Sequence, residues 1–368
     1  MKVVVTGAGG FIGRNLCATL DRMDGVEVNR VFSTTQRNEY SSWIREADII
    51  YHLAGVNRPK DPSEFVTGNT NFTREILEIA AEGDIVPTFV ISSTTQAIKD
   101  NDYGKSKRAA EELVEEYASN GKIHGAIYRL PGVFGKWSRP NYNSVVSTFC
   151  YNAANELPLE VRDPSFALPL VYVDDVVQAF LSHLNSRFMG LGTFEVTPAF
   201  HTNLGELADI ISSFPGLRKS LRAPKVGKGL EKRLYSTYLS YLPLDKFSYP
   251  MELKKDNRGD LFEWIKSEEF GQIFVSTTKP GVTRGNHYHH TKTEKFLVIR
   301  GEAEIGFRQI DSDQVITYKV NGLEPTVVDI PTGYTHNITN TGQTELITLF
   351  WANEIFDTER PDTYFLEV

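Results

Sequence analysis

Short apolar runs alternate with longer amphipathic segments over roughly the first 215 residues of the chain. Runs that are rich in β-forming residues and bounded by turn residues predict strands at 2–5, 49–53, 88–91 and 126–128. Between them, apolar positions at helical spacing predict helices such as 71–81 and 106–118. This alternation predicts βαβ units, and therefore a parallel sheet wound with helices on both faces.

The pattern changes after about residue 250. Six β-rich runs follow at close spacing, at 272–277, 296–299, 302–307, 315–320, 326–330 and 345–351. Glycine and proline separate them and no helical pattern intervenes, which predicts a small antiparallel barrel or jelly roll. Residues 218–249 show neither pattern and are interpreted as a linker with a docking segment. The predicted domains are 1–240 and 253–368, joined by a linker and docking segment at 241–252.

Composition agrees with a two-domain globular protein. A length of 368 residues exceeds one ordinary core, and 40% hydrophobic with 23% charged residues excludes a disordered chain. The formal net charge of −8 argues against nucleic acid or an anionic membrane as the main partner. Two cysteines, Cys17 and Cys150, provide no disulfide framework. With no signal-like segment and no apolar run near the roughly 18 residues of a membrane span, we expect a cytoplasmic protein.

A glycine-rich turn follows the first predicted strand. Gly7 permits a tight turn, Gly10 allows backbone to approach a pyrophosphate, and Gly13 lets the following helix pack closely on the strand. A helix N-terminus at this point offers free N–H groups to phosphates. The turn, with Phe11 and Ile12, predicts a dinucleotide site, and the alternative is a generic strand–helix turn.

The end of the second predicted strand reports on the type of dinucleotide. NAD sites usually carry Asp or Glu there, whereas arginine suits a 2′-phosphate. This chain has Arg30 and, a few residues on, Arg37, with no acidic residue at the strand's end. The prediction is NADPH rather than NADH, and the alternative is that both arginines are surface charges.

Tyr103 and Lys107 stand four residues apart, and thus on one face of a helix start. A ketone reductase must protonate the oxyanion that hydride transfer creates, and a tyrosine can do so when a nearby cation lowers its pKa of about 10. A hydroxyl that polarises the carbonyl completes such a centre. Thr94 is the first choice for it and Ser93 the second. The pair alone occurs by chance in many helices, so the prediction depends on its combination with the glycine turn.

With these motifs in place, residues 1–240 resemble an extended short-chain dehydrogenase/reductase, the family of nucleotide-sugar epimerases and reductases. Segments 48–55, 128–135 and 171–176 also resemble that family. The resemblance implies a Rossmann-type doubly wound sheet and a nucleoside-diphosphate sugar as substrate. It further implies that the cofactor contacts include Leu53, Ala54, Gly55, Lys107 and Arg129. The loop 141–144 is interpreted either as a sugar or diphosphate contact or as an ordinary polar loop.

A second candidate site lies in the β-rich tail. Alternation along a strand places His287 and His289 on one face, and Glu294 can reach them from the return strand. His336 follows on a late strand, while His290 replaces one of the pair if the strand bulges. Imidazole and carboxylate ligands predict zinc or another divalent metal ion.

These four residues resemble the two motifs of the cupin superfamily, although Gly322 lies too far from Pro331 for the usual start of the second motif. Residues 256–263 and 279–287 resemble segments of deoxysugar 3,5-epimerases. The resemblance implies a jelly-roll barrel that moves a proton next to a 4-keto group. His287 also occupies the position of the base in the epimerases without metal, and it cannot readily be both base and ligand. The alternative is a barrel whose metal is only structural.

Over its full length the chain resembles bifunctional capsular-polysaccharide enzymes, in which a reductase is fused to a cupin epimerase. That resemblance implies a UDP-2-acetamido-2,6-dideoxy-hexos-4-ulose as substrate, UDP-N-acetyl-6-deoxy-L-talosamine as product, NADPH, zinc and a homodimer. Two alternatives are a reductase whose tail only binds substrate or dimerises, and a non-reducing epimerase or dehydratase. Thr95-Gln96 stands where dehydratases carry acidic residues, which favours reduction.

Overall fold

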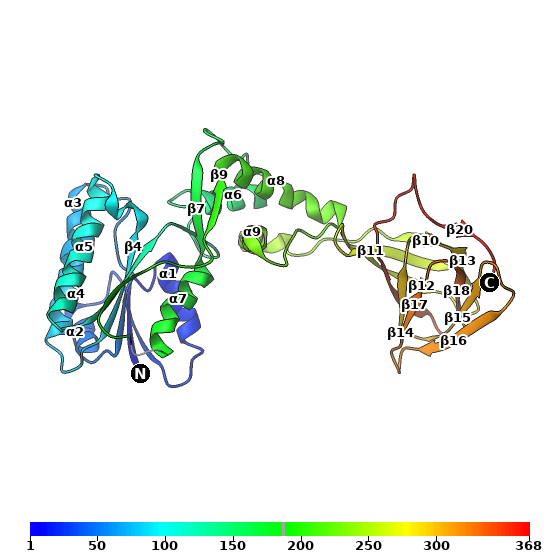
Figure 1. The fold of residues 1–368 in the computed structure, drawn as a ribbon, viewed down its shortest axis with the longest axis horizontal. Coiled ribbons are helices and arrows are strands. Elements are labelled where there is room, and N and C mark those ends of the chain that lie inside the picture. Colours follow the sequence, from blue (N-terminus) through cyan, green and yellow to red (C-terminus); the bar gives the residue numbers. More distant parts are fainter. Residues whose placement is uncertain (186–187) are drawn as a thin grey trace. The chain divides into compact units, whose positions relative to one another are not determined.

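The computed structural model describes residues 1–185 and 188–368, without the side chain of Asn185. The chain forms two compact units (Figure 1). Unit 1 comprises Met1–Ser213 and Val226–Pro243, and unit 2 comprises Phe214–Lys225 and Leu244–Val368. Each unit is therefore built from two separate stretches of chain. The domain limits of 240 and 253 remain a prediction.

Unit 1 contains a six-stranded parallel sheet with the order β2-β1-β3-β4-β5-β8. Its strands are β1 (Lys2–Thr6), β2 (Glu27–Val31), β3 (Ile49–His52), β4 (Thr88–Thr94), β5 (His124–Leu130) and β8 (Leu191–Phe194). The central strands are almost continuously apolar, as expected for a sheet that is covered on both faces. Val3, Val4 and Val5 are all fully buried. The prediction of a doubly wound α/β fold is confirmed.

Helices cover both faces of this sheet (Figure 1). On one face α1 (Phe11–Leu20) and α7 (Val173–Asn185) pack together over Val3, Val5 and Tyr51. On the other face lie α2 (Arg37–Arg45), α4 (Phe72–Ala81) and α5 (Asp102–Ser119). Two short helical segments, α3 (Ser63–Phe65) and a π-helical turn (Val66–Asn71), precede α4, and a 3-10 turn (Thr95–Ile98) follows β4.

The remainder of unit 1 lies beyond the carboxyl ends of the strands. A small sheet joins β6 (Gly132–Phe134), β7 (Ala167–Tyr172) and β9 (Phe200–Asn203). It is accompanied by α6 (Val145–Ala154), α9 (Gly229–Leu239) and the part of α8 (Leu204–Ser220) that precedes Phe214. Helix α9 packs on α6 and buries Leu234 and Tyr238. The sequence predicted only a linker and docking segment over 218–249, so the end of α8 and all of α9 were missed.

Residues 244–368 of unit 2 form two antiparallel sheets, and the all-β prediction for this part of the chain is confirmed. One sheet has the order β10-β11-β12-β19-β14-β17, with β10 (Lys254–Asp256), β11 (Gly259–Ser267), β12 (Gly271–Thr278), β14 (Glu294–Arg300), β17 (Val327–Ile330) and β19 (Leu346–Ala352). The other has the order β16-β15-β18-β13-β20, with β13 (Thr283–Tyr288), β15 (Glu302–Gln309), β16 (Val315–Asn321), β18 (Tyr334–Asn340) and β20 (Tyr364–Phe365). Phe296, Ile305, Ile338 and Phe350 belong to the core, to which both sheets contribute. A 3-10 turn (Leu244–Lys246) precedes β10.

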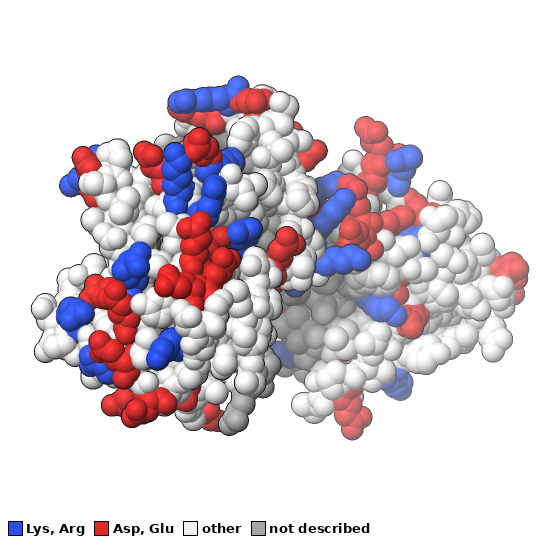
Figure 2. All heavy atoms as spheres, turned by 60° about the vertical axis from the view of Figure 1, so that its left-hand side comes forward, with Lys and Arg blue, Asp and Glu red and all other residues white. Residues whose placement is uncertain are grey.

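The surface carries charges of both signs. Acidic and basic side chains are intermixed over the face that Figure 2 presents, in keeping with the modest net charge of −8. Among the described residues, no helix combines the length and the apolar character that a membrane crossing requires.

Candidate functional sites

A cleft of about 1240 Å³ opens in unit 1 at the carboxyl ends of the parallel strands, where open α/β sheets bind their ligands. It exceeds the roughly 300–1,000 Å³ of an ordinary ligand pocket, so it has room for a dinucleotide together with a second molecule. The predicted residues that line it are Gly7, Gly10, Phe11, Ile12, Gly13, Leu53, Gly55, Ser93, Thr94, Tyr103 and Lys107.

The glycine turn at one end of the cleft has no space for side chains. A Cβ on Gly13 would lie 2.2 Å from the carbonyl oxygen of Gly7, and one on Gly7 would lie 2.6 Å from the backbone nitrogen of Ala54. Gly7 also has a φ of 68°, in the left-handed region that glycine adopts readily. Gly10 caps α1 without a side-chain hydrogen bond, so no side-chain cap occupies the N-terminus of the helix. Such a terminus suits a diphosphate.

The predicted reducing centre is built by the start of α5 and the end of β4. The side chain of Asn101 caps α5 by accepting a hydrogen bond from the N–H of Gly104 at 2.7 Å. Tyr103 and Lys107 follow on consecutive turns, and both line the cleft that Thr94 also lines. The first-choice hydroxyl of the sequence prediction therefore lies in the same cleft as the phenol.

The two titratable groups of this centre are both shifted by burial. Burial raises the pKa of Tyr103, and the Thr94 side chain opposes that shift. Burial lowers the pKa of Lys107 to about 8, opposed by the charge of Glu111. The Lys107 ammonium donates to the carbonyl of Ser92 at 2.8 Å. The lowering of the Tyr103 pKa by Lys107, expected from the sequence, remains a prediction.

Ser93, the second-choice hydroxyl, lies against a different partner. It donates a hydrogen bond to Glu111, a glutamate that is 2% exposed. Glu111 also forms an ion pair of 2.6 Å with Arg129. The sequence analysis missed Glu111, although its position one turn after Lys107 on the same helix face was a usable signal.

A buried polar network behind the cleft was also missed. The His52 ring lies between the hydroxyls of Thr6 and Thr73, each at 2.9 Å. Burial lowers the pKa of His52 to about 3, so the ring is neutral. Asn69 accepts the N–H of the loop after β3 at 2.8 Å and donates to Ser106 at 3.0 Å. The network ties that loop to the helix that carries the reducing centre.

The two arginines expected near the adenosine end are both engaged in ion pairs. Arg30 pairs with Asp21 near the end of α1, and Arg37 pairs with Glu75 at 2.6 Å. Among the described residues that line the cleft, neither arginine is found. Ala54 and Arg129 are likewise absent from the described residues that line the cleft.

The loop 141–144 separates the main cleft from a second pocket of about 730 Å³. Its Tyr142, Asn143 and Ser144 line both. The guanidinium groups of Arg58 and Arg139 lie over the Tyr142 ring, 5.6 and 5.3 Å from its centroid. The loop is therefore held in place by cation–π contacts beside the cleft.

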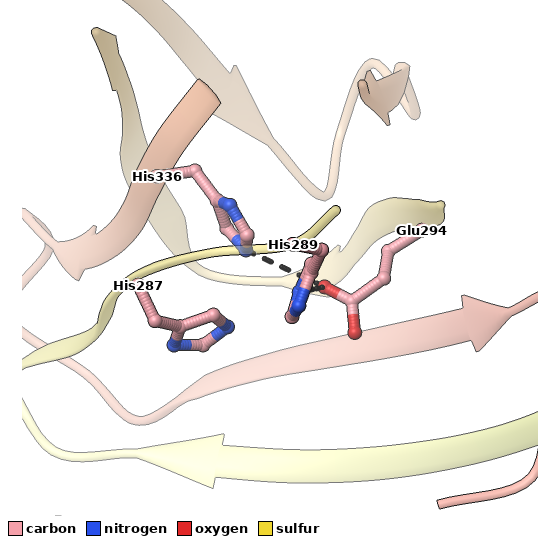
Figure 3. A group of neighbouring side chains, drawn as sticks. All are labelled: His287, His289, Glu294 and His336. Carbon is pink, nitrogen blue, oxygen red and sulfur yellow. Dashed lines mark ion pairs between the residues drawn. The ribbon is translucent and has the colours of Figure 1, made fainter. Parts of the chain in front are cut away.

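In unit 2, the four predicted ligands come together. One donor atom from each of His287, His289, Glu294 and His336 lies within 4.8 Å of the others, and Figure 3 shows the side chains converging. His287 comes from β13, where the pairing with β18 shifts register between Gly285 and His287. Glu294 begins β14 and His336 belongs to β18. His289 and His336 are fully buried.

The geometry of the cluster suits a small cation. The Nε2 atoms of His289 and His336 lie 3.5 and 3.4 Å from one carboxylate oxygen of Glu294. A tetrahedral zinc site with bonds of about 2.1 Å separates its ligands by about 3.4 Å. Both Nε2 atoms are buried without a hydrogen-bond partner. Because buried donor atoms are normally satisfied, these residues fit a divalent ion.

Charges within the cluster point the same way. Burial alone would raise the pKa of Glu294, but the neighbouring His289 and His336 outweigh it and hold that pKa below its usual range. Burial, with the charges of neighbouring groups, lowers the pKa of His287 to about 4. A neutral His287 imidazole and an ionised Glu294 carboxylate are the protonation states in which these two residues bind metal.

His290 does not join the cluster, although the strand does bulge. Its ring packs against Tyr288 and Tyr364, with centroids 5.4 and 5.0 Å away. Its backbone N–H donates to Asp362. Of the two alternatives that the sequence left open, His287 is the histidine that lies with the other three ligands.

Comparison with known proteins follows the division of the chain. Residues 3–192 match the family model of the NAD dependent epimerase/dehydratase family, and residues 254–364 match the polysaccharide biosynthesis C-terminal domain. The chain is 45% identical over 369 residues to the UDP-2-acetamido-2,6-beta-L-arabino-hexul-4-ose reductase of Pseudomonas aeruginosa, covering 100% of this chain and 99% of that protein.

Among solved structures, the chain is similar to CapF, the capsular polysaccharide assembling protein from Staphylococcus aureus. The two share 44% sequence identity with a TM-score of 0.92, over 100% of both chains. A UDP-glucuronic acid 4-epimerase from Bacillus cereus shares the fold alone, with 21% identity, a TM-score of 0.53, and coverage of 59% of this chain and 83% of that one.

Proposed function

Because this chain belongs to the NAD-dependent epimerase/dehydratase family and carries a polysaccharide biosynthesis C-terminal domain, we propose that it is a bifunctional sugar-nucleotide enzyme. Unit 2 epimerises C3 of a UDP-2-acetamido-2,6-dideoxy-hexos-4-ulose, and unit 1 reduces the C4 ketone with NADPH. The product is UDP-N-acetyl-6-deoxy-L-talosamine, a precursor of capsular polysaccharide. The name of the Pseudomonas relative, a reductase of a UDP-linked acetamido ketosugar, supports this substrate class.

The observation that carries the reductase half is that Thr94, Tyr103 and Lys107 line the same cleft as the glycine turn. A bound nicotinamide supplies the hydride that is added to C4. Tyr103 gives its phenolic proton to the C4 oxygen, so that the carbonyl becomes an alcohol. Thr94 hydrogen-bonds the same oxygen, and the Lys107 ammonium stabilises the phenolate that remains.

The proposed cofactor is NADPH, held by the N–H groups of the glycine turn and, at its ribose, by Lys107. Strand β2 is followed by Phe32 and Ser33, which offer no carboxylate to a ribose 2′-hydroxyl. The exposed Arg37 begins the next helix and can exchange Glu75 for a phosphate. Arg37→Ala is expected to raise KM for NADPH and leave KM for NADH unchanged.

The epimerase half depends on the cluster of His287, His289, Glu294 and His336, which we propose as the ligands of zinc or another divalent ion. A divalent ion there supplies positive charge for an enolate oxygen. The proton at C3 is acidic because the C4 ketone is adjacent, and its return on the opposite face inverts C3.

One experiment tests both halves. The full chain is incubated with the 4-keto substrate and NADPH in D₂O, while NADPH oxidation is followed by absorbance and deuterium at C3 by mass spectrometry. Stoichiometric NADPH oxidation with deuterium at C3 is expected. No NADPH consumption would exclude the reductase.

A second candidate is a reductase whose unit 2 only dimerises or binds substrate. The four protein donors favour it, since structural zinc sites have all four coordination positions filled by the protein. Reduction without deuterium at C3 would select this candidate. In both cases we propose a homodimer, which sedimentation equilibrium tests.

A further inference from the structure

The last residues of the chain run along the proposed metal centre. Residues 361–368, here called the C-terminal strap, include β20, which pairs with β13 so that Phe365 stands opposite His287. Further on, the Leu366 N–H donates to the Asn286 carbonyl at 3.0 Å. Thr335, next to His336, donates its hydroxyl to the Leu366 carbonyl. The strap therefore contacts two of the strands that carry ligands.

Asp362 fixes the strap to the turn after β13. Its carboxylate accepts hydrogen bonds from the backbone N–H groups of His290, Thr291 and Lys292, at 3.0, 2.8 and 2.9 Å. It also accepts the Thr291 hydroxyl at 2.9 Å. Asp362 has a φ of 38°, in the left-handed region that few non-glycine residues adopt. The side-chain hydrogen bonds thus hold Asp362 in this uncommon backbone conformation.

That conformation turns the carbonyl of Asp362 toward a ligand. The His289 Nδ1 lies 2.6 Å from this oxygen, and the ring is fully buried. Only a protonated Nδ1 can donate to a carbonyl, which leaves the lone pair on Nε2. Nε2 is the atom that faces Glu294, at 3.5 Å. Metal-binding histidines commonly have their tautomer and ring orientation fixed by such a second hydrogen bond.

We propose that the C-terminal strap is a functional part of the metal centre and that Asp362 is a positioning residue for His289. The carboxylate anchors the strap, and the carbonyl of the same residue orients the imidazole with its Nε2 lone pair toward the cation. This inference rests on the proposed metal centre. It assigns to the chain end a role in metal affinity without making it a ligand.

Zinc affinity of the full chain tests the proposal, measured by competition with a chromophoric chelator. Asp362→Gly removes the anchor and tolerates the backbone conformation, and it is expected to weaken zinc binding about 10- to 100-fold. Asp362→Asn keeps one acceptor and is expected to restore part of the affinity. The matched control is Asp357→Gly, which removes the carboxylate that accepts the Glu359 N–H at 2.9 Å in the same chain end, and it is expected to bind like wild type.

A second readout does not depend on affinity. In the metal-free protein, histidine side-chain ¹⁵N shifts, assigned with His289→Gln, are expected to show protonated Nδ1 on His289 in wild type and a mixture of tautomers in Asp362→Asn. Wild-type zinc affinity in a folded Asp362→Gly, or an unchanged tautomer in Asp362→Asn, would overturn the proposal. If wild type binds no divalent ion, the proposed metal centre falls as well. If wild type binds zinc and His336→Gln does not, the metal centre stands. Wild-type zinc affinity in Asp362→Gly would then disprove only the proposed role of the C-terminal strap.

Discussion

The two candidate sites are assembled in opposite ways. The reducing centre takes Thr94, Tyr103 and Lys107 from one strand end and the helix that follows, and it lines a wide cleft. The histidine cluster collects its residues from β13, β14 and β18 and the turn between, and most of its side chains are buried. The geometry of the first site depends on one strand end and one helix, whereas that of the second depends on the register of several strands of the barrel.

Their buried charges differ as well. Lys107 has a carbonyl partner at 2.8 Å and the carboxylate of Glu111 nearby, so unit 1 compensates this cation with its own groups. At the cluster, the Nε2 atoms of His289 and His336 have no hydrogen-bond partner. The comparison teaches that unit 1 satisfies the buried charge of its site with its own groups, while the cluster in unit 2 has donor atoms that a cation would satisfy.

Tyr103→Phe is the sharpest test of the separation between the sites. Loss of the proton donor is expected to lower kcat for ketone reduction by about 10²- to 10⁴-fold. Deuterium incorporation at C3 is expected to stay at the wild-type level, because unit 2 keeps all its ligands. A parallel loss of both activities would contradict two independent sites.

His336→Gln reverses that experiment. Loss of a ligand is expected to remove the bound metal and to slow deuterium incorporation at C3 by about 100-fold, since a catalytic metal stabilises the transition state by several kcal/mol. Reduction of substrate already epimerised at C3 is expected to change little. His201→Gln, an exposed histidine of unit 1, is the control. Unchanged C3 exchange in a metal-free His336→Gln would assign the cluster a structural role.

The buried Lys107 ammonium should make the free energy of unfolding of unit 1 depend on pH. Its pKa falls from 10.5 to about 8 on folding, so between these values the unfolded chain binds more protons than the folded one. The free energy of unfolding of unit 1 is therefore expected to rise between pH 8 and pH 10, by about 2 kcal/mol relative to Lys107→Met. Urea unfolding at several pH values measures the difference, and parallel curves for the two proteins would disprove it.

Glu111→Gln should have the smallest effect. The amide keeps a hydrogen bond but loses the charge that compensates Arg129, and a loss of about 1.5 kcal/mol in the stability of unit 1 is expected. Zinc affinity in unit 2 serves as the internal control and is expected to stay constant. A change in zinc affinity would show that the units are energetically coupled.

What the sequence could predict follows from the same contrast. The parallel sheet and the pair Tyr103–Lys107 follow from local periodicity, which fixes which residues share a face. The four proposed ligands were found because few histidines exist in the chain and their spacing fits strands.

Residues whose role depends on partners far away in the sequence could not be predicted in this way. His52 and Glu111 look like ordinary positions of a strand and a helix, and only the tertiary structure places hydroxyl or guanidinium partners beside them. Asp362 lies 73 positions from His289, and no periodic pattern connects them. Helix α9 was missed because Gly229 and the lysines before it resemble a linker, while its stability comes from packing on α6.

The discontinuous composition of the two units limits how the gene can be divided. The chain passes from one unit to the other after Ser213, Lys225 and Pro243, so no single cut yields either unit whole. A cut after residue 240 separates Ala223 from Lys266, whose carbonyl accepts the Ala223 N–H at 2.8 Å. A chimaera that replaces unit 2 by another barrel must therefore also replace residues 214–225, because they belong to unit 2.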